Sequence, residues 1–348
     1  MKKLASFTLL LGVGAFAHAQ SSVTLFGVLD VNARYVKNDE TSLKTISAGG
    51  INTSRFGVRG TEDLGGGLKA GFWLESGINP DTGSTSEDLS KPGSRFWNRR
   101  STVSLSSASL GEIRLGRDFT PTYNGYTAYD AFGSNGVGAV DKFFVSTLGT
   151  GNPSIDTGTR ADNLVSYFTP AGLGGFYGQL SAAAGEGTSG KRYLGGRAGY
   201  AAGPLDVSAA YGQTRVTPGA SGEDSYQVID FGAAYDFGVA KLLGIYGQSK
   251  YGELKMNVLE IGALVPVGAG TIRASYVRAD AKGGTIEADD ATQLALGYVH
   301  NLSKRTAVYT TVARVNNKGA AKFAVASSPA LPAGKDSTGF ELGIRHSF

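Results

Sequence analysis

Cysteine is absent from the chain, and histidine is scarce. Without thiols there is neither a disulfide framework nor a thiolate metal site. A hydrolase needs a nucleophile, a base and a group that orients the base, and neither His300 nor His346 has such a setting. The third histidine, His18, lies in a segment that we expect to be removed. We therefore expect no enzyme, no catalytic residue, no metal ligand and no cofactor.

Long hydrophobic runs are also missing after residue 19, where none approaches the roughly 20 residues of a membrane helix. The one earlier run, from Leu4 to Phe16, follows two lysines and ends in Ala17-His18-Ala19. This is the pattern of a secretory signal peptide. We expect cleavage after Ala19, so that residues 1–19 are the signal peptide and residues 20–348 form a single exported domain.

Proline and charge are sparse, whereas glycine is abundant. The chain has 10 prolines and 52 glycines, and 18% of its residues are charged, below the usual value of about a quarter. A formal net charge of +4 gives no reason to expect nucleic-acid binding. Segments with the composition of amphipathic helices are not evident. An exported chain of this composition is expected to be built from strands.

The chain does have a two-residue alternation of polar and apolar side chains, which indicates strands with two different faces. From Val23 to Tyr35 apolar residues and glycine take every second position, and Arg34 falls between them. Residues 54–62 repeat the pattern with Arg55 and Arg59 on one face. An arginine that faces lipid at the bilayer midplane costs about 2–4 kcal/mol. Both arginines are therefore expected to face water inside a barrel.

Seven short turns alternate along the chain with eight longer polar connections, which lie near residues 38–52, 80–94, 119–160, 187–190, 217–223, 250–254, 281–289 and 317–336. This order predicts an all-β fold, a transmembrane antiparallel up-and-down β-barrel of 16 strands. The connection at 119–160 is far longer than the usual about 4–6 residues and shows no strand or helix period. We expect this third long loop to fold into the lumen and narrow it.

Several stretches together resemble the Gram-negative general-diffusion porins, especially the betaproteobacterial type. They are Val23–Asp30 (VTLFGVLD), Ser54–Gly65 (SRFGVRGTEDLG), Gly116-Arg117 and the terminal Phe348. The resemblance implies a homotrimer in the Gram-negative outer membrane, with the third long loop as the constriction. It also implies that Phe348 is an assembly signal, read by the barrel-assembly machinery.

The resemblance further implies a basic wall at the constriction, carried over onto Arg55, Arg99 and Arg160. Strict alternation with Val103 turns Arg100 rather than Arg99 inward, so both stay candidates. The complete candidate set is a basic wall of Arg34, Arg55, Arg59, Arg99, Arg100 and Arg160, and an acidic pair of Glu75 and Asp130.

One departure from the family bears on selectivity. Porins of the enteric branch carry a Pro-Glu-Phe-Gly-Gly run in the constriction loop, whose carboxylate faces the arginines. At the corresponding place this chain reads Asp130-Ala131-Phe132-Gly133-Ser134, without a glutamate. Because a ring of arginines around a narrow aqueous passage attracts anions and repels cations, we expect an electropositive constriction.

The expected function is passive diffusion of small hydrophilic solutes and ions, with a preference for anions. One alternative is a substrate-selective channel that binds phosphate or small organic anions. Another is an adhesin-like barrel whose loops bind a host or a phage. Acidic pairs in the expected outer loops, namely Glu87-Asp88, Glu223-Asp224 and Asp289-Asp290, are either solvated charges or sites where divalent cations bridge to lipopolysaccharide.

Overall fold

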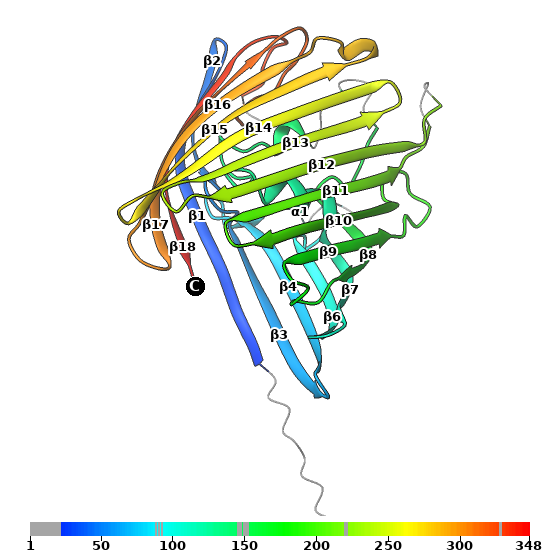
Figure 1. Cartoon of the computed structure of the whole chain (residues 1–348). Helices are drawn as coiled ribbons and strands as arrows, with labels where there is room; N and C mark the ends of the chain where they lie inside the picture. The colour runs from blue at the N-terminus through cyan, green and yellow to red at the C-terminus, as the bar shows by residue number, and fades with distance from the viewer. Residues whose placement is uncertain are drawn as a thin grey trace, which may run out of the picture.

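The computed structural model describes residues 22–87, 89, 91, 93–144, 148, 153–218, 222–326 and 329–348. The expected signal peptide, residues 1–19, lies outside the described residues, as does Asp88 of the first acidic pair. In the described part the chain forms one antiparallel sheet that closes into a barrel (Figure 1).

Strands make up most of the described chain. They are β1 (Ser22–Asn38), β2 (Thr41–Ala48), β3 (Arg55–Gly65), β4 (Leu68–Asn79), β5 (Ser84–Thr85), β6 (Arg100–Ser107), β7 (Gly111–Phe119), β8 (Arg160–Phe168), β9 (Phe176–Ala183), β10 (Tyr193–Ala202), β11 (Leu205–Arg215), β12 (Ser225–Asp236), β13 (Lys241–Tyr251), β14 (Leu254–Val267), β15 (Gly270–Lys282), β16 (Ala291–Asn301), β17 (Thr306–Asn317) and β18 (Ser337–Ser347). The short helices are α1 (Pro121–Thr127), η1 (Asp141–Phe143) and η3 (Gly284–Ile286). No helix in the described ranges is long and apolar enough to cross a membrane.

The barrel closes through β1. This strand pairs with β18 on one side and with both β2 and β3 on the other, so the ring of strand pairings is complete. Because β2 and β3 pair with successive halves of β1, they are two pieces of one barrel strand, interrupted at residues 49–54. The two-residue β5 pairs only with β4 and lies in a loop. Sixteen strands thus form the barrel in the described chain, and the predicted fold is confirmed.

One expected connection is wrong. Most of residues 38–52 is not a loop, because β2 pairs with β1 from Asn38↔Thr41 to Val31↔Ala48. A tight turn joins the two strands, and Asp39 adopts a left-handed backbone with φ of 56° there. Strand β1 has 17 residues and extends beyond its pairing with β3. The remaining half of β1 needs hydrogen-bond partners, and β2 supplies them.

Side-chain exposure follows the predicted alternation. On β1, Leu29 is 40% exposed on the outer face, whereas the adjacent Asp30 is fully buried inside. The outer faces of β12 and β16 likewise expose Phe231, Leu294 and Leu296. An apolar exterior around a polar interior is the arrangement that lipid requires of a barrel.

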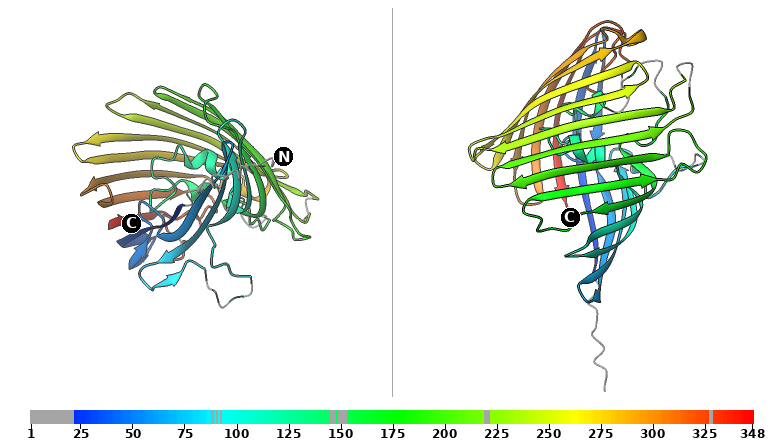
Figure 2. Two further views of the ribbon diagram at one scale, coloured as in Figure 1. Left: turned by 90° about the horizontal axis from the view of Figure 1, so that it is seen from below. Right: turned by 45° about the vertical axis from the view of Figure 1, so that its right-hand side comes forward.

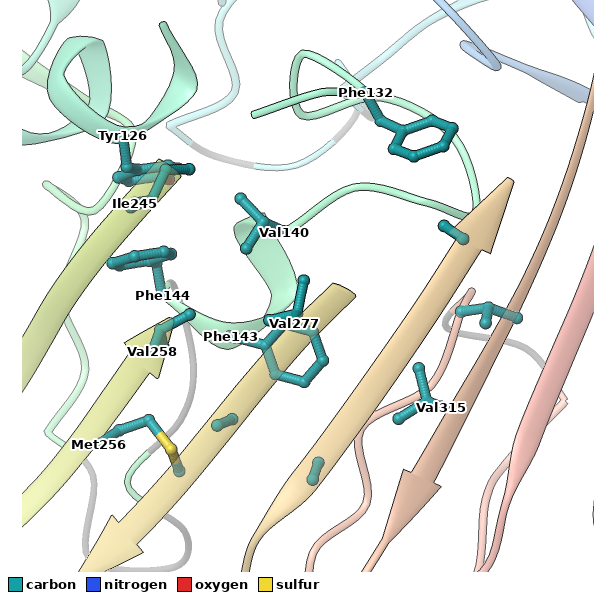
Figure 3. Close-up of a cluster of buried hydrophobic side chains, with 14 of the residues drawn as sticks. Tyr126, Phe132, Val140, Phe143, Phe144, Ile245, Met256, Val258, Val277 and Val315 are labelled. Atoms are coloured by element: carbon teal, nitrogen blue, oxygen red, sulfur yellow. The ribbon is translucent and has the colours of Figure 1, made fainter. Parts of the chain in front are cut away.

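The long connection between β7 and β8 folds inside the barrel, as predicted, and carries α1 and η1 with it (Figures 1 and 2). Its apolar side chains form a buried cluster with the inner wall from β12 to β17 (Figure 3). The loop contributes Tyr126, Tyr129, Phe132, Val140, Phe143 and Phe144, and the wall contributes Ile245, Met256, Val258, Val277 and Val315. Burial of apolar area against the wall therefore holds the loop to one side of the lumen.

Glycines on the wall make room for the aromatic rings of the loop. A Cβ atom added to Gly247 on β13 would lie 2.3 Å from Cε1 of Phe144, and one added to Gly232 on β12 would overlap the ring of Tyr129. Because real side chains do not approach this closely, the two aromatic rings depend on the absence of a Cβ atom.

We expect Gly247→Val to displace the loop, because valine would occupy the place of the Phe144 ring. Overpacking of this kind should lower the free energy of unfolding by about 1–3 kcal/mol. Equilibrium denaturation in detergent micelles measures the change. Gly244→Val is the matched control, since Gly244 lies on the same strand and its nearest neighbour is a backbone oxygen 3.8 Å away. Equal stability of the two variants would contradict the packing argument.

Candidate functional site

The carboxylate of Glu75 on β4 lies between two guanidinium groups. Arg99 Nε donates a hydrogen bond to Glu75 Oε1 at 2.6 Å, and Arg55 Nε lies 3.6 Å from the same oxygen. Trp73 Nε1 donates to the other carboxylate oxygen at 3.2 Å. The side chains of Arg55 and Arg99 remain 23% and 14% exposed. One carboxylate thus anchors two cations that still reach the lumen water.

Arg99 and Arg100 are neighbours in sequence, yet both guanidinium groups contact acidic residues of this wall. Arg100 is the first residue of β6 and pairs with Glu75, so alternation turns it inward. Its Nε lies 3.5 Å from Asp118 Oδ2. Arg99 precedes the strand, so the alternation of β6 does not set the direction of its side chain. The backbone N–H of Arg99 donates to the Glu75 carbonyl oxygen. The structure therefore brings both candidates to the same region of the wall.

Arg160, the first residue of β8, is held by aromatic rings rather than by an acid. Its Cζ lies 4.1 Å from the ring centroid of Phe119. That ring stacks on Tyr123 of α1, with centroids 4.8 Å apart and planes 11° apart. In the described ranges no hydrogen bond or ion pair engages the Arg160 guanidinium, and its Nε is buried without a partner. Its positive charge is therefore not neutralised by a contact.

The other two candidate arginines have different surroundings. Arg34 on β1 is 3.1 Å from Glu341 Oε2 on β18, so it pairs with that carboxylate rather than with Glu75. Arg59 on β3 is exposed to the lumen, and its Cζ lies 4.9 Å from the ring centroid of Trp73. Arg59 is four residues closer than Arg55 to the short turn that joins β3 to β4.

The carboxylate of Asp130 is turned into its own loop. It accepts hydrogen bonds from the backbone N–H groups of Phe132 at 2.8 Å, Ser134 at 2.7 Å and Val140 at 3.2 Å. The side chain of Asp130 is almost fully buried. These bonds show a role in shaping the loop, and the predicted role of Asp130 in the pore field stays a prediction.

A second set of polar contacts joins the loop to the wall. Lys142 Nζ donates to Gln293 Oε1 on β16 at 2.8 Å, and Gln293 Nε2 donates back to the Gly138 carbonyl oxygen at 2.8 Å. Burial lowers the pKa of the Lys142 amine. The N–H of Val137 donates to Glu341 Oε1 at 3.4 Å. The loop is thus fixed by hydrogen bonds as well as by apolar packing.

Several inward-facing arginines were missed from the sequence, and Arg114, Arg273 and Arg345 are three of them. Arg114 on β7 binds both carboxylate oxygens of Glu112 at 2.9 Å. Arg273 on β15 and Arg345 on β18 each have a buried Nε without a partner. All three lie at polar positions of strands in which polar and apolar residues alternate. The alternation that placed Arg55 inside the barrel would therefore have placed these arginines there as well.

The terminal Phe348 is joined to β1. Its N–H donates to the Gly27 carbonyl oxygen at 3.0 Å, and the Gly27 N–H donates to the Phe348 carbonyl oxygen at 3.1 Å. The phenyl ring covers Gly27. These contacts help to close the barrel, and the role of Phe348 as an assembly signal stays a prediction. Within the described ranges no three His, Cys, Asp or Glu side chains are grouped to hold a metal ion.

Comparison with known proteins gives a consistent result. A family model described as Gram-negative porin matches residues 5–320. Outer membrane porin protein 32 of Delftia acidovorans is 43% identical, over 100% of this chain and 99% of that protein. The solved anion-selective porin from Comamonas acidovorans superposes with a TM-score of 0.84 at 42% identity, covering 94% of this chain and 100% of that chain. The trimer form of OmpT from Vibrio cholerae shares the fold, with a TM-score of 0.70 at 16% identity, covering 94% of this chain and 99% of that one.

We expect Asp130→Ala to loosen the loop, because it removes the acceptor of three backbone N–H groups. A hydrogen bond to a charged group contributes about 1.5–3 kcal/mol, so amide exchange around residues 132–140 should accelerate about tenfold or more. Hydrogen–deuterium exchange with mass spectrometry measures this change. Asp156→Ala is the control in the same loop, since Asp156 is exposed and the single contact of its carboxylate within the described ranges is with Lys191 at 3.9 Å. Unchanged exchange in the Asp130 variant would refute the anchoring role.

Proposed function

The chain belongs to the Gram-negative porin family and is an outer-membrane channel rather than an enzyme, and on that premise we propose that its constriction prefers anions. Small hydrophilic solutes and ions pass by passive diffusion through the water-filled barrel. The constriction lies between the folded loop and the wall that carries Glu75. Its basic wall comprises Arg55, Arg99 and Arg160, with Arg100 beside them.

The supporting observation is the imbalance of charge around Glu75. Arg55 and Arg99 share this single carboxylate, and Arg160 contacts no acid in the described chain. Three cations therefore accompany one anion where the loop narrows the lumen. The surrounding barrel has a low dielectric constant and focuses this field on the aqueous path, which lowers the energy of a passing anion. The solved Comamonas porin, similar to this chain, is itself described as anion-selective.

The assembly that we propose is a homotrimer in outer-membrane lipid and lipopolysaccharide, inserted by the barrel-assembly machinery after cleavage of the signal peptide at residues 1–19. The resemblance to trimeric porins supports it. Native mass spectrometry of the detergent-extracted protein tests both parts, because the mass gives the number of subunits and the absence or presence of the leader. A monomer, or a subunit that retains residues 1–19, would contradict the respective part.

The general pore and the substrate-selective channel predict different conductance curves. In a general pore, conductance rises linearly with salt concentration, whereas a channel with a strong site for phosphate or an organic anion saturates at low concentration. Planar-bilayer recordings of the wild-type protein in KCl and in potassium phosphate distinguish the two.

We expect Arg160→Gln to weaken the anion preference. A unit charge about 6 Å from a passing ion contributes about 0.7 kcal/mol in water, attractive for an anion and repulsive for a cation, so its loss changes the anion-to-cation permeability ratio about tenfold. Reversal potentials across a KCl gradient measure this ratio. Arg278→Gln removes the same charge from an exposed position on β15 and should leave the ratio unchanged. A cation preference of the wild-type protein would refute the proposal itself.

We expect Glu75→Gln to shift the anion-to-cation permeability ratio in the opposite direction, by a similar factor of about ten, because it leaves Arg55 and Arg99 uncompensated. Glutamine keeps the shape of the side chain, so the wall should stay intact. The same reversal-potential measurement applies, and Glu253→Gln, in the exposed turn between β13 and β14, is the control. If the anion-to-cation permeability ratio changed in the same direction in the Arg160 and the Glu75 variants, movement of the loop rather than charge would set the ratio.

A further inference from the structure

Residues 49–54, which interrupt the barrel strand formed by β2 and β3, are held at both ends by one residue of β1. The Asp30 carbonyl oxygen accepts a hydrogen bond from the Gly49 N–H at 3.1 Å. At the other end, Ser54 Oγ accepts from the Asp30 N–H at 2.9 Å and donates to the Asp30 carbonyl oxygen at 3.0 Å. The backbone of Asp30 therefore fixes where this segment leaves the wall and where it returns.

The carboxylate of Asp30 holds the middle of the same segment. Three successive backbone N–H groups donate to it, from Gly50 to Oδ1 at 3.1 Å and from Ile51 and Asn52 to Oδ2 at 3.0 and 2.8 Å. The hydroxyl group of Tyr309 on β17 also donates to Oδ1. Hydrogen bonds to an ionised acceptor are roughly twice as strong as those between neutral groups. The shape of residues 50–52 thus depends on one buried carboxylate.

The other side of the segment holds Arg55, the first residue of β3. Arg55 Nη1 donates to Asn52 Oδ1 at 2.7 Å and to the Thr53 carbonyl oxygen at 2.9 Å. Both acceptors are neutral, so they orient the guanidinium group without cancelling its charge. Arg55 Nε stays 3.6 Å from Glu75 Oε1, which is longer than a hydrogen bond. The segment therefore keeps Arg55 from a closer ion pair with Glu75.

The segment also touches the folded loop. Thr53 Oγ1 donates to Asn135 Oδ1 at 3.0 Å. A Cβ atom added to Gly136 would lie 2.3 Å from the Gly50 carbonyl oxygen, so the two backbones are in direct contact. Residues 49–54 thus connect Asp30 to both parts of the constriction, the basic wall and the loop.

We propose that Asp30 is a positioning residue for ion selectivity, because its carboxylate shapes the segment that orients Arg55 toward the lumen. Asp30 is fully buried and does not touch a passing ion. Its effect on permeation is therefore transmitted through residues 50–53 to the guanidinium group. The inference rests on the proposed anion preference, since Arg55 belongs to the basic wall of the constriction.

An effect transmitted through Arg55 and a direct effect of the Asp30 charge have opposite signs. Loss of one negative charge by itself favours anions and raises the anion-to-cation permeability ratio. Loss of the shape of residues 50–53 frees Arg55 to close on Glu75, which lowers the ratio because the positive charge is then neutralised. The direction of the change separates the two explanations.

Asp30→Asn tests the proposal. The amide has the size of the carboxylate but one accepting oxygen instead of two, so at least one of the three N–H groups loses its acceptor. Because Arg55 moves but keeps its charge, we expect the anion-to-cation permeability ratio to fall about threefold. Amide exchange at residues 50–52 should accelerate about tenfold. Reversal potentials across a KCl gradient and hydrogen–deuterium exchange measure these changes. An unchanged or higher ratio would overturn the proposal.

A double variant shows whether Arg55 transmits the effect. If it does, adding Asp30→Asn to Arg55→Gln changes the ratio no further, because the group that Asp30 positions is already absent. A general disturbance of the barrel would instead lower the ratio in both backgrounds, and that result would contradict the proposed role. Asp230→Asn on β12 is the matched control for exchange. Its carboxylate is also fully buried but has no hydrogen-bond partner in the described chain, so exchange at residues 50–52 should stay unchanged.

Two measurements replace Asp30→Asn if that variant does not fold. In the wild-type protein, the amides of residues 50–52 should exchange about a hundredfold more slowly than unprotected amides, because a charged acceptor binds them. Asn52→Ala removes the side-chain acceptor of Arg55 and keeps the three N–H groups, so it should lower the ratio in the wild-type background but not in Arg55→Gln. Unprotected amides at residues 50–52, or an unchanged ratio in Asn52→Ala, would overturn the proposal.

The two proposals fail separately. An anion preference that Asp30→Asn leaves unchanged removes the positioning role alone. A cation preference of the wild-type protein removes the proposed selectivity of the constriction, while the dependence of the ratio on Asp30 through Arg55 is still measured by the double variant.

Discussion

Apolar contact between the β7–β8 loop and the inner wall is the interaction on which the geometry of the lumen depends. Phe143, Phe144 and their neighbours bury their side chains against β12 to β17 (Figure 3). Burial of one large apolar side chain contributes about 1.5–3 kcal/mol, so several of them together hold a loop that has little regular structure. Water would otherwise solvate this loop, and the position of the constriction would not be fixed.

The same contact decides where charge can face water. Because the loop covers the wall from β12 to β17, the polar wall from β3 to β8 stays uncovered. Glu75 and the arginines around it lie on this wall, on adjacent strands. Asp130 keeps its carboxylate inside the loop, where three N–H groups bind it. The asymmetry of packing therefore produces an asymmetry of charge across the lumen.

Alternation in the sequence was sufficient to predict the barrel and the inward direction of Arg55 and Arg59, because a lipid-facing arginine is costly. Alternation does not fix the direction of a side chain at the residue where a strand begins. For this reason the sequence could not decide which of Arg99 and Arg100 faces the lumen. It also carries no information about side chains within a loop. The inward turn of the Asp130 carboxylate follows from N–H groups of residues two to ten positions away, which only the folded loop brings together. The β2 strand was missed because its residues pair with the end of an unusually long β1.

Aromatic rings in this wall orient arginine side chains without neutralising their charge. A guanidinium group needs contacts to stay in one orientation, yet a carboxylate contact cancels its charge. Arg160 is instead oriented by the ring of Phe119, 4.1 Å from its centroid. Arg100 lies 4.4 Å from the ring centroid of Trp73, in addition to its 3.5 Å contact with Asp118. A cation–π contact contributes about 0.5–1 kcal/mol at an exposed site and leaves the charge of the arginine intact. Where the carboxylate is present, at Glu75, it is shared by two arginines, so the wall keeps both its order and its positive field.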